Sequence, residues 1–97
     1  MLTHPAILPR YIDRTMYQTL GIADRMRAYL VLRSTPTRPK TLAKVSGGTA
    51  AGASLGADIQ NGYVMRCSLG HYYATKRGRL AFRERLPAAL FGEGTDA

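Results

Sequence analysis

Cationic side chains are the residues of this chain whose type and grouping best suit a chemical role. Guanidinium and ammonium groups bind phosphates, and each phosphate that they neutralise releases counterions, which gives affinity with little sequence information. Any single arginine can equally be a solvated surface charge, so the hypothesis depends on grouping. Two groups are present, the first made of Arg38, Lys40 and Lys44 and the second of Arg66, Lys76, Arg77 and Arg79.

The overall charge also favours a polyanionic partner. The chain has 97 residues and a formal net charge of +8, and its pI is near 10.3. A surplus of cations on a small protein makes nucleic acid the first candidate for a partner. The alternative is a generally basic protein that has no such partner.

Groups that could perform catalysis or bind a metal are few. The chain has two histidines, six carboxylates and a single cysteine, Cys67, and none of them has the spacing of a zinc site or a catalytic constellation. We therefore expect no enzyme activity, no metal and no cofactor. Cys67 is expected to be a buried strand residue, with a reactive thiol as the alternative. The phrase Ser46-Gly47-Gly48-Thr49 lacks the Gly-Lys-Ser/Thr sequence of a phosphate loop.

Length and hydropathy limit the organisation of the chain. With 97 residues, 45% of them hydrophobic, one folded domain is expected. No apolar run approaches the ~20 residues that span a bilayer. The N-terminus lacks the basic start and apolar core of a secretion signal, so a cytoplasmic protein outside the membrane is expected.

A hairpin followed by a helix is the clearest structural pattern. Asn61-Gly62 offers a left-handed helix end, and residues 63–67 form an aromatic and β-branched run. Residues 68–70 supply a turn, and residues 71–74 form a second aromatic strand. Thr75 can cap the helix that follows, because its hydroxyl can accept a hydrogen bond from an amide two or three residues later.

Helical patterns precede the hairpin. Apolar residues at four-residue spacing predict a first helix that contains Ile12, Met16 and Leu20 and a second helix that contains Ile22, Met26 and Leu30. Prolines predict an extended arm at residues 2–10 and a loop at residues 35–40. Thr41 is then expected to cap a short helix that ends at Val45, before a glycine turn.

The helix predicted over residues 49–60 has an apolar stripe of Ala51, Leu55 and Ile59. No lysine or arginine lies between Lys44 and Arg66, so the commonest specific contact, arginine to guanine, is missing from this helix. Ser54 and Gln60 can still bond base edges, and the alanines can contact thymine methyl groups. Gly52 and Gly56 predict close packing against a neighbouring helix, with a ligand or DNA backbone contact and locally irregular structure as alternatives. The outward residues are expected to be Ala50, Ala53, Ser54, Ala57 and Gln60.

After the hairpin, Leu80, Phe82 and Leu86 are the apolar residues of a last helix that stops at Pro87. Leu90 and Phe91 are expected to dock on the domain, followed by a loose tail.

The order of these elements, together with Gly62-Tyr63-Val64 and Thr75-Lys76-Arg77-Gly78, resembles the winged helix-turn-helix DNA-binding domain of prokaryotic transcription regulators. The resemblance covers residues 22–86. It implies an α+β, mainly helical fold, to which the predicted helix with Ile12, Met16 and Leu20 is an addition at the N-terminus. The expected organisation is an arm and short helix at residues 1–21, the winged domain at 22–86 and a tail at 87–97.

The resemblance implies a small transcription regulator of prokaryotic or phage type that binds double-stranded DNA. The helix at residues 49–60 would face the groove, and the cations on either side of it would bind phosphates. The expected nucleic-acid-binding residues are Arg38, Lys40, Lys44, Thr49, Ala53, Ser54, Gln60, Arg66, His71, Lys76, Arg77 and Arg79.

Other partners stay open. A compact winged core does not require the stripe of Ile12, Met16 and Leu20, so this stripe is expected either to form a dimer interface or to pack across the core, and we predict a homodimer through it. One alternative is a protein-interaction module that uses the uncharged face of residues 49–60. Another is a nucleic-acid binder, for RNA or DNA, without sequence preference.

Overall fold

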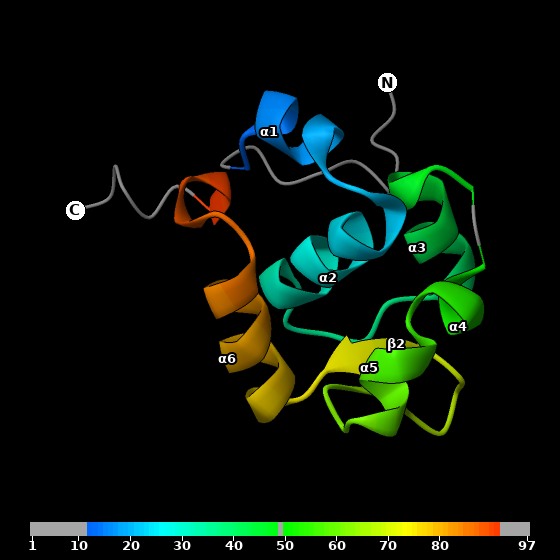
Figure 1. The fold of residues 1–97 in the computed structure, drawn as a ribbon. Helices are drawn as coiled ribbons and strands as arrows, with labels where there is room; N and C mark the ends of the chain where they lie inside the picture. Colours follow the sequence, from blue (N-terminus) through cyan, green and yellow to red (C-terminus); the bar gives the residue numbers. More distant parts are fainter. Residues whose placement is uncertain (1–11, 49, 92–97) are drawn as a thin grey trace.

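The computed structural model describes residues 12–48 and 50–91, which form a mainly helical α+β fold (Figure 1). The predicted fold class, α+β and mainly helical, is confirmed. The predicted arm at residues 2–10 and the last residues of the predicted tail, 92–97, lie outside the described residues. Along the chain the elements are α1 (Arg14–Thr19), α2 (Ile22–Leu32), α3 (Pro39–Ser46), α4 (Ala51–Ser54), α5 (Gly56–Gln60), β1 (Val64–Arg66), β2 (Tyr72–Ala74), α6 (Lys76–Arg85) and the 3-10 helix η1 (Ala88–Phe91).

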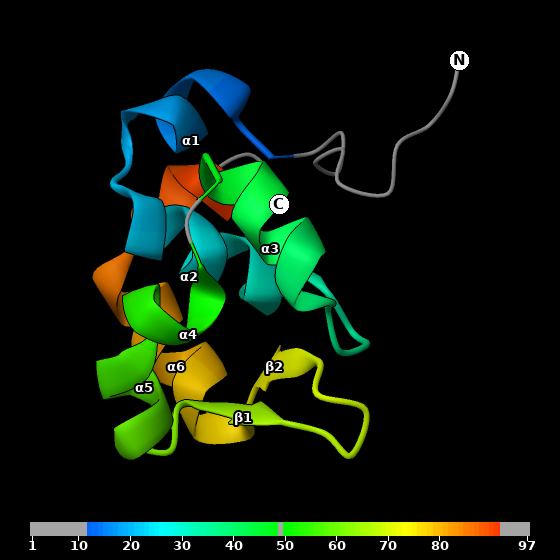
Figure 2. The ribbon, with the colours of Figure 1, turned by 90° about the vertical axis from the view of Figure 1, so that its right-hand side faces the viewer.

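Helix α2 lies at the centre of the molecule, between α1 at one end and the β1–β2 hairpin at the other (Figures 1 and 2). Its Met26, Tyr29 and Leu30 are fully buried because α3, α4, α6 and β2 all pack against it. Burial of such side chains stabilises the fold by roughly 1.5–3 kcal/mol each. The prediction of a buried helix is confirmed for Met26 and Leu30, whereas Ile22 at the first residue of the helix is exposed.

The short N-terminal helix α1 belongs to the same hydrophobic core. Asp13 caps it by accepting a hydrogen bond from the Met16 amide at 3.0 Å. The helix is shorter than predicted, since Ile12 precedes it and Leu20 is its C-cap. Ile12 is nevertheless buried in the core, and Met16 and Leu20 pack against it. Of the two uses predicted for this stripe, packing across the core is the one observed, and the predicted homodimer loses the observation on which it rested. The end of the described chain packs beside this helix, since the Asp13 amide donates to the Leu90 carbonyl at 3.3 Å.

Helix α3 starts earlier than the sequence pattern predicted. It begins at Pro39 with Arg38 as its N-cap, and Thr41 lies inside the first turn. Proline suits this first position because its fixed φ is already helical and the missing N–H would have no partner inside the helix. The helix ends at Ser46, and its C-cap is Gly47, whose φ of 119° lies in the left-handed region. The amides of Gly47 and Gly48 both donate to the Ala43 carbonyl, which closes the C-terminus.

The single helix predicted at residues 49–60 is wrong in detail, because the chain forms two short helices there. Helices α4 and α5 meet at Leu55, whose φ of −105° and ψ of 16° are not helical. Two causes favour the break. Gly52 and Gly56 lower the helix propensity on either side of it, and the buried Leu55 is held in the core at that position. The irregular structure that was one alternative for the two glycines is what the chain adopts.

The predicted hairpin is confirmed. Strands β1 and β2 are antiparallel, with Val64 opposite Ala74 and Arg66 opposite Tyr72. The turn closes through a hydrogen bond from the Gly70 amide to the Cys67 carbonyl at 2.9 Å. A further bridge, not predicted, pairs Thr37 with Tyr72 on the other edge of β2.

The two sequence phrases that flank the hairpin are in direct contact. The Thr75 hydroxyl donates to the Gly62 carbonyl at 2.8 Å and accepts a hydrogen bond from the Gly78 amide at 3.0 Å, which confirms Thr75 as the N-cap of α6. A Cβ atom at residue 78 would overlap the backbone of Tyr63, so the helix can approach this closely only because residue 78 is glycine. The start of α6 is thereby fixed to the start of the hairpin.

Candidate nucleic-acid interface

The first group of predicted cations lies on the surface of α3. Arg38 is exposed at the N-cap, and Lys40 and Lys44 are exposed along the helix. Long side chains with their charged ends in water are suited to reach phosphates, because their apolar stems stay on the protein. The structure therefore leaves these side chains accessible to a polyanion.

The second group divides between the two ends of the hairpin. Arg66 is exposed near the turn, with its guanidinium carbon 5.1 Å from the centre of the Tyr72 ring. Lys76 and Arg77 are exposed in the first turn of α6, where the hairpin ends, and the Arg77 guanidinium carbon lies 5.3 Å from the centre of the Tyr63 ring. Stacking on these rings orients the guanidinium groups without removing them from water.

Arg79, the remaining residue of the second group, forms hydrogen bonds within the protein. Its two terminal nitrogens donate hydrogen bonds of 2.7 Å each to the carbonyls of Val31 and Arg33. These carbonyls are at the C-terminal end of α2, where helical carbonyls lack partners within the helix. Arg79 therefore ties α6 to the end of α2, and phosphate binding by this residue would compete with those bonds.

The sequence pattern did not predict the buried ion pair between Arg27 and Asp58. Arg27 Nε donates to Asp58 Oδ2 at 2.7 Å, and Arg27 Nη1 bonds Asp24 Oδ1. Burial lowers the pKa of Arg27, but the hydrogen bonds and charges of Asp58 and Asp24 outweigh burial, so this pKa is raised. Asp58 thus occupies the inward stripe of α5, and Ile59, which was expected there, is only half-buried.

The pairing of Asp58 matters for the electrostatics of the whole surface. It is the only carboxylate between Asp24 and Glu84 in the sequence. Because its charge is buried against Arg27, the remaining charged side chains of that long segment are all cations. The surface built by this segment is therefore electropositive.

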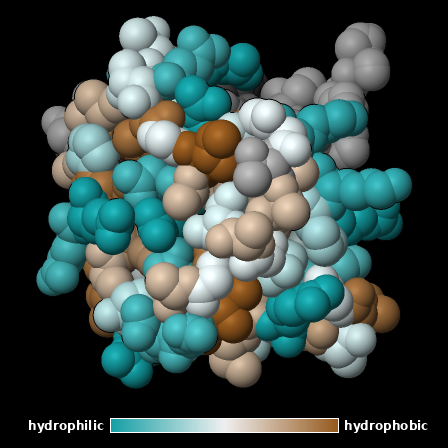
Figure 3. All heavy atoms as spheres, turned by 45° about the vertical axis from the view of Figure 1, so that its right-hand side comes forward, coloured by the Kyte–Doolittle hydropathy of each residue, from teal (hydrophilic) through white to brown (hydrophobic). Residues whose placement is uncertain are grey.

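The outward face of α4 and α5 is small and uncharged. Ala53 and Gln60 are exposed and Ser54 is half-buried, while Thr49 lies outside the described residues. In Figure 3 pale and brown residues fill the middle of this face and hydrophilic residues lie to either side of it. Gly52 faces the hairpin, since a Cβ atom there would lie 3.2 Å from the Tyr72 hydroxyl, so it packs on a strand residue and not on a helix.

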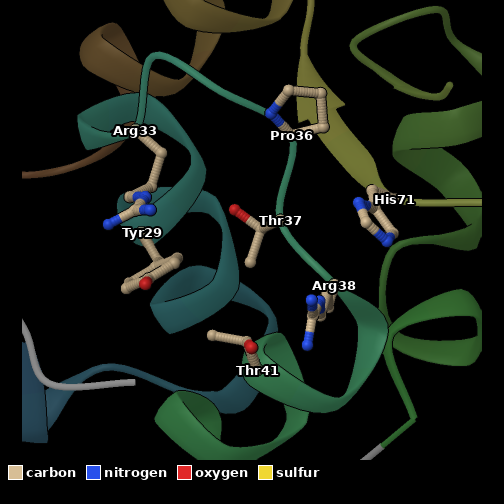
Figure 4. Close-up of a pocket in the computed structure, with 7 residues that line it drawn as sticks. All are labelled: Tyr29, Arg33, Pro36, Thr37, Arg38, Thr41 and His71. Carbon is tan, nitrogen blue, oxygen red and sulfur yellow. The ribbon is translucent and has the colours of Figure 1, made fainter. Parts of the chain in front are cut away.

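Arg38, from the first group of predicted cations, and His71, from the start of the second predicted strand, line the same hollow (Figure 4). The hollow has a volume of about 330 Å³ and lies between the end of α2, the start of α3 and the start of β2. Its lining residues are Tyr29, Arg33, Pro36, Thr37, Arg38, Thr41 and His71. The sequence pattern missed Arg33, Thr37 and Thr41 as neighbours of His71. The two prolines around Thr37 indicated a plain loop.

Cys67 is not the buried strand residue that the sequence pattern predicts. It follows the last residue of β1 and is half-buried, so it is not a core residue. Hydrogen bonds from the backbone at Leu69 and His71 lower the pKa of its thiol. Among the described residues no group of histidine, cysteine and carboxylate side chains is arranged to hold a metal ion.

Comparisons with protein-family models, with curated proteins and with solved structures give no match for this chain. Within residues 12–48 and 50–91, no helix has the length and apolar character needed to cross a membrane.

Proposed function

We propose that the protein binds double-stranded DNA as a winged helix-turn-helix protein and acts as a small transcription regulator of prokaryotic or phage type. One observation carries the proposal. The segment between Asp24 and Glu84 exposes only cationic charges, because its single carboxylate, Asp58, is buried against Arg27. A cationic surface over α3, the hairpin and the start of α6 attracts a polyanion. No exposed carboxylate of this segment repels the phosphates.

The arrangement of elements supports the winged interpretation. Helix α4 packs against both α2 and α3, as the groove-facing helix of a helix-turn-helix would. The bridge between Thr37 and Tyr72 places the segment before α3 beside the hairpin. In this interpretation the β1–β2 hairpin is the wing.

The chemistry of the face favours affinity over sequence discrimination. Phosphates would be held by the exposed cations Arg38, Lys40, Lys44, Arg66, Lys76 and Arg77, with His71 at the edge of the hairpin. Base edges would meet the outward side of α4 and α5, where Ser54 and Gln60 can form hydrogen bonds and Ala53 can contact a thymine methyl group. Because this face has no arginine, base reading contributes less than phosphate binding. The homodimer stays a prediction, and the burial of Ile12 in the core of a single copy gives it no support.

A salt series on the affinity tests the proposal. Fluorescence anisotropy with duplex DNA, both random and taken from the region that encodes the protein, gives the dissociation constant at each salt concentration. Six phosphate contacts predict that log K falls against log salt with a slope of about −5. Absence of binding to either duplex at low salt contradicts the proposal, and so does a slope near zero.

A protein-docking function is the second candidate, and the hairpin surface favours it. Met65 is 48% exposed and Leu69 is 77% exposed, so the hairpin has two exposed apolar side chains four residues apart. Exposed apolar residues at one site are typical of a protein partner. Substitution of Leu69 by serine separates the two functions. It leaves the salt slope unchanged if the protein binds DNA through its cations, and it abolishes capture of a partner if the hairpin docks a protein.

A further inference from the structure

The hollow at the end of α2 contains a polar group that the protein leaves without a partner. Thr37 is 5% exposed, and its Oγ1 is buried without a hydrogen-bond partner. Buried hydroxyl groups in proteins are almost always hydrogen-bonded, so an isolated one calls for a specific explanation. In the view of Figure 4 the hydroxyl oxygen is on the side of Thr37 that faces Arg33.

The backbone holds Thr37 rigidly in this position. Its amide donates to the Tyr72 carbonyl at 2.7 Å, and its carbonyl accepts from the Tyr72 amide at 2.8 Å. Both backbone groups are therefore satisfied by β2, and only the side chain is left to bind something else. A donor fixed in advance costs little ordering when a ligand arrives.

The charges around the hollow determine which ligand suits it. Arg33 and Arg38 line it, and the Arg33 guanidinium carbon is placed 5.6 Å from the centre of the Tyr29 ring. Among the described lining residues there is no carboxylate, so their positive charge is not neutralised within the hollow. His71 and Thr41 add further hydrogen-bonding groups.

The start of α3 adds backbone donors. Arg38 is the N-cap of this eight-residue helix, and no side chain caps its first turn. The amides of Lys40 and Thr41 are in that turn, where helical N–H groups point outward and the helix dipole favours an anion. Pro39 has no N–H, so the two amides after it are the first donors available.

We propose that this hollow binds a small organic anion, through an oxyanion group such as a phosphate or carboxylate held by Arg33, Arg38 and the Thr37 hydroxyl. The volume of about 330 Å³ is at the lower end of the range for small-ligand sites and leaves room for a body beyond the oxyanion group. A small anion bound here would place a ligand between α2, α3 and the hairpin, beside the surface proposed to bind DNA. The site does not depend on the DNA-binding proposal.

Titration with inorganic phosphate in the absence of DNA tests the site. Amide NMR spectra are recorded while phosphate replaces chloride at constant ionic strength. We expect saturable shifts at Thr37, Lys40, Thr41 and His71. Thr37→Val keeps the shape and the backbone bridge, and it should weaken phosphate binding about tenfold, as expected for loss of a hydrogen bond to a charged group.

Matched variants separate the site from general attraction of anions. Arg38→Gln should weaken phosphate binding, whereas Arg14→Gln, which removes another exposed arginine, on α1, should not. Thr35→Val, an exposed threonine outside the hollow, is the control for Thr37→Val. Equal effects of Arg38→Gln and Arg14→Gln overturn the proposal, as do shifts spread over all exposed cations.

The effect of Thr37→Val on DNA binding distinguishes a site for a free anion from a site for a DNA phosphate. If Thr37→Val weakens DNA binding while phosphate alone causes no saturable shift, the hollow receives a backbone phosphate and the small-molecule proposal is wrong. Saturable phosphate binding that Thr37→Val weakens supports the proposal even in a protein that fails to bind DNA. Failure of the two proposals is thus distinguishable.

Discussion

Substitution of Asp58 by alanine should destabilise the protein strongly, although the sequence pattern did not include this residue in the inward stripe of the helix predicted at residues 49–60. The Arg27 and Asp58 side chains are only 10% and 7% exposed, and the distance from Arg27 Nε to Asp58 Oδ2 is 2.7 Å. Loss of one partner from a buried ion pair costs about 3–5 kcal/mol, because the other charge stays buried. Arg27 retains Asp24. We therefore expect the lower end of this range, about 3 kcal/mol.

Such a loss is large for a domain of this size. Stability of roughly 0.05–0.15 kcal/mol per residue gives about 5–15 kcal/mol in total for a chain of this length. A change of about 3 kcal/mol should lower the melting temperature by about 12–24 °C. Asp58→Asn keeps an oxygen that can accept from Arg27 Nε, so it should cost less, about 1–2 kcal/mol.

Urea denaturation followed by circular dichroism measures both variants. Glu84→Gln is the control, since it removes an exposed carboxylate from α6 and should change the free energy of unfolding by less than about 0.5 kcal/mol. If Asp58→Ala and Glu84→Gln have the same unfolding midpoint, the reasoning about the buried pair is refuted. A shift for Asp58→Ala as large as expected, with Asp58→Asn between it and the parent, is the result that agrees with it.

Three further predictions concern the hairpin and the proposed interface. Gly78→Ala should cost about 1–3 kcal/mol because its methyl group overlaps the Tyr63 backbone. Gly56→Ala meets no atom within 4 Å and should be neutral or stabilising by up to ~1 kcal/mol; equal melting temperatures for the two variants would contradict this. Arg38→Ala should flatten the salt slope of DNA binding by about one unit. Arg79→Ala should instead lower the melting temperature, by loss of two bonds to α2, and leave the slope unchanged; the reverse pattern would show that the roles of the two arginines are exchanged. Ala53→Glu should weaken DNA binding at least tenfold in anisotropy measurements if α4 faces the groove, with circular dichroism as the check on folding, and unchanged affinity would exclude a groove contact at that residue.

The hairpin and its junction with α6 could be predicted from the sequence because their causes are local. Gly62 adopts a φ of 77°, and Gly70 a φ of 81°, conformations that glycine reaches without a steric penalty. Thr75 caps a helix through an amide three residues away. Alternation along β1 and β2 needs only neighbouring residues, so these elements were assigned correctly. The exposure of the cations on α3 was also predictable, since long charged side chains seldom lie in a core.

Features that depend on contacts between distant segments were decided only by the tertiary structure. Asp58 turns inward because Arg27, 31 residues earlier, is buried beside it, and the same helix period would equally allow it to face solvent. Ile12 is buried in the core of a single copy of the protein. Beside it α1 packs against η1, which comes from the opposite end of the described chain. The hollow around Thr37 exists because the bridge to Tyr72 brings a proline-flanked loop next to His71. Sequence spacing carries helix and strand periods, but it does not contain the distances between elements, and those distances determine which charges are paired and which hydroxyl is left without a partner.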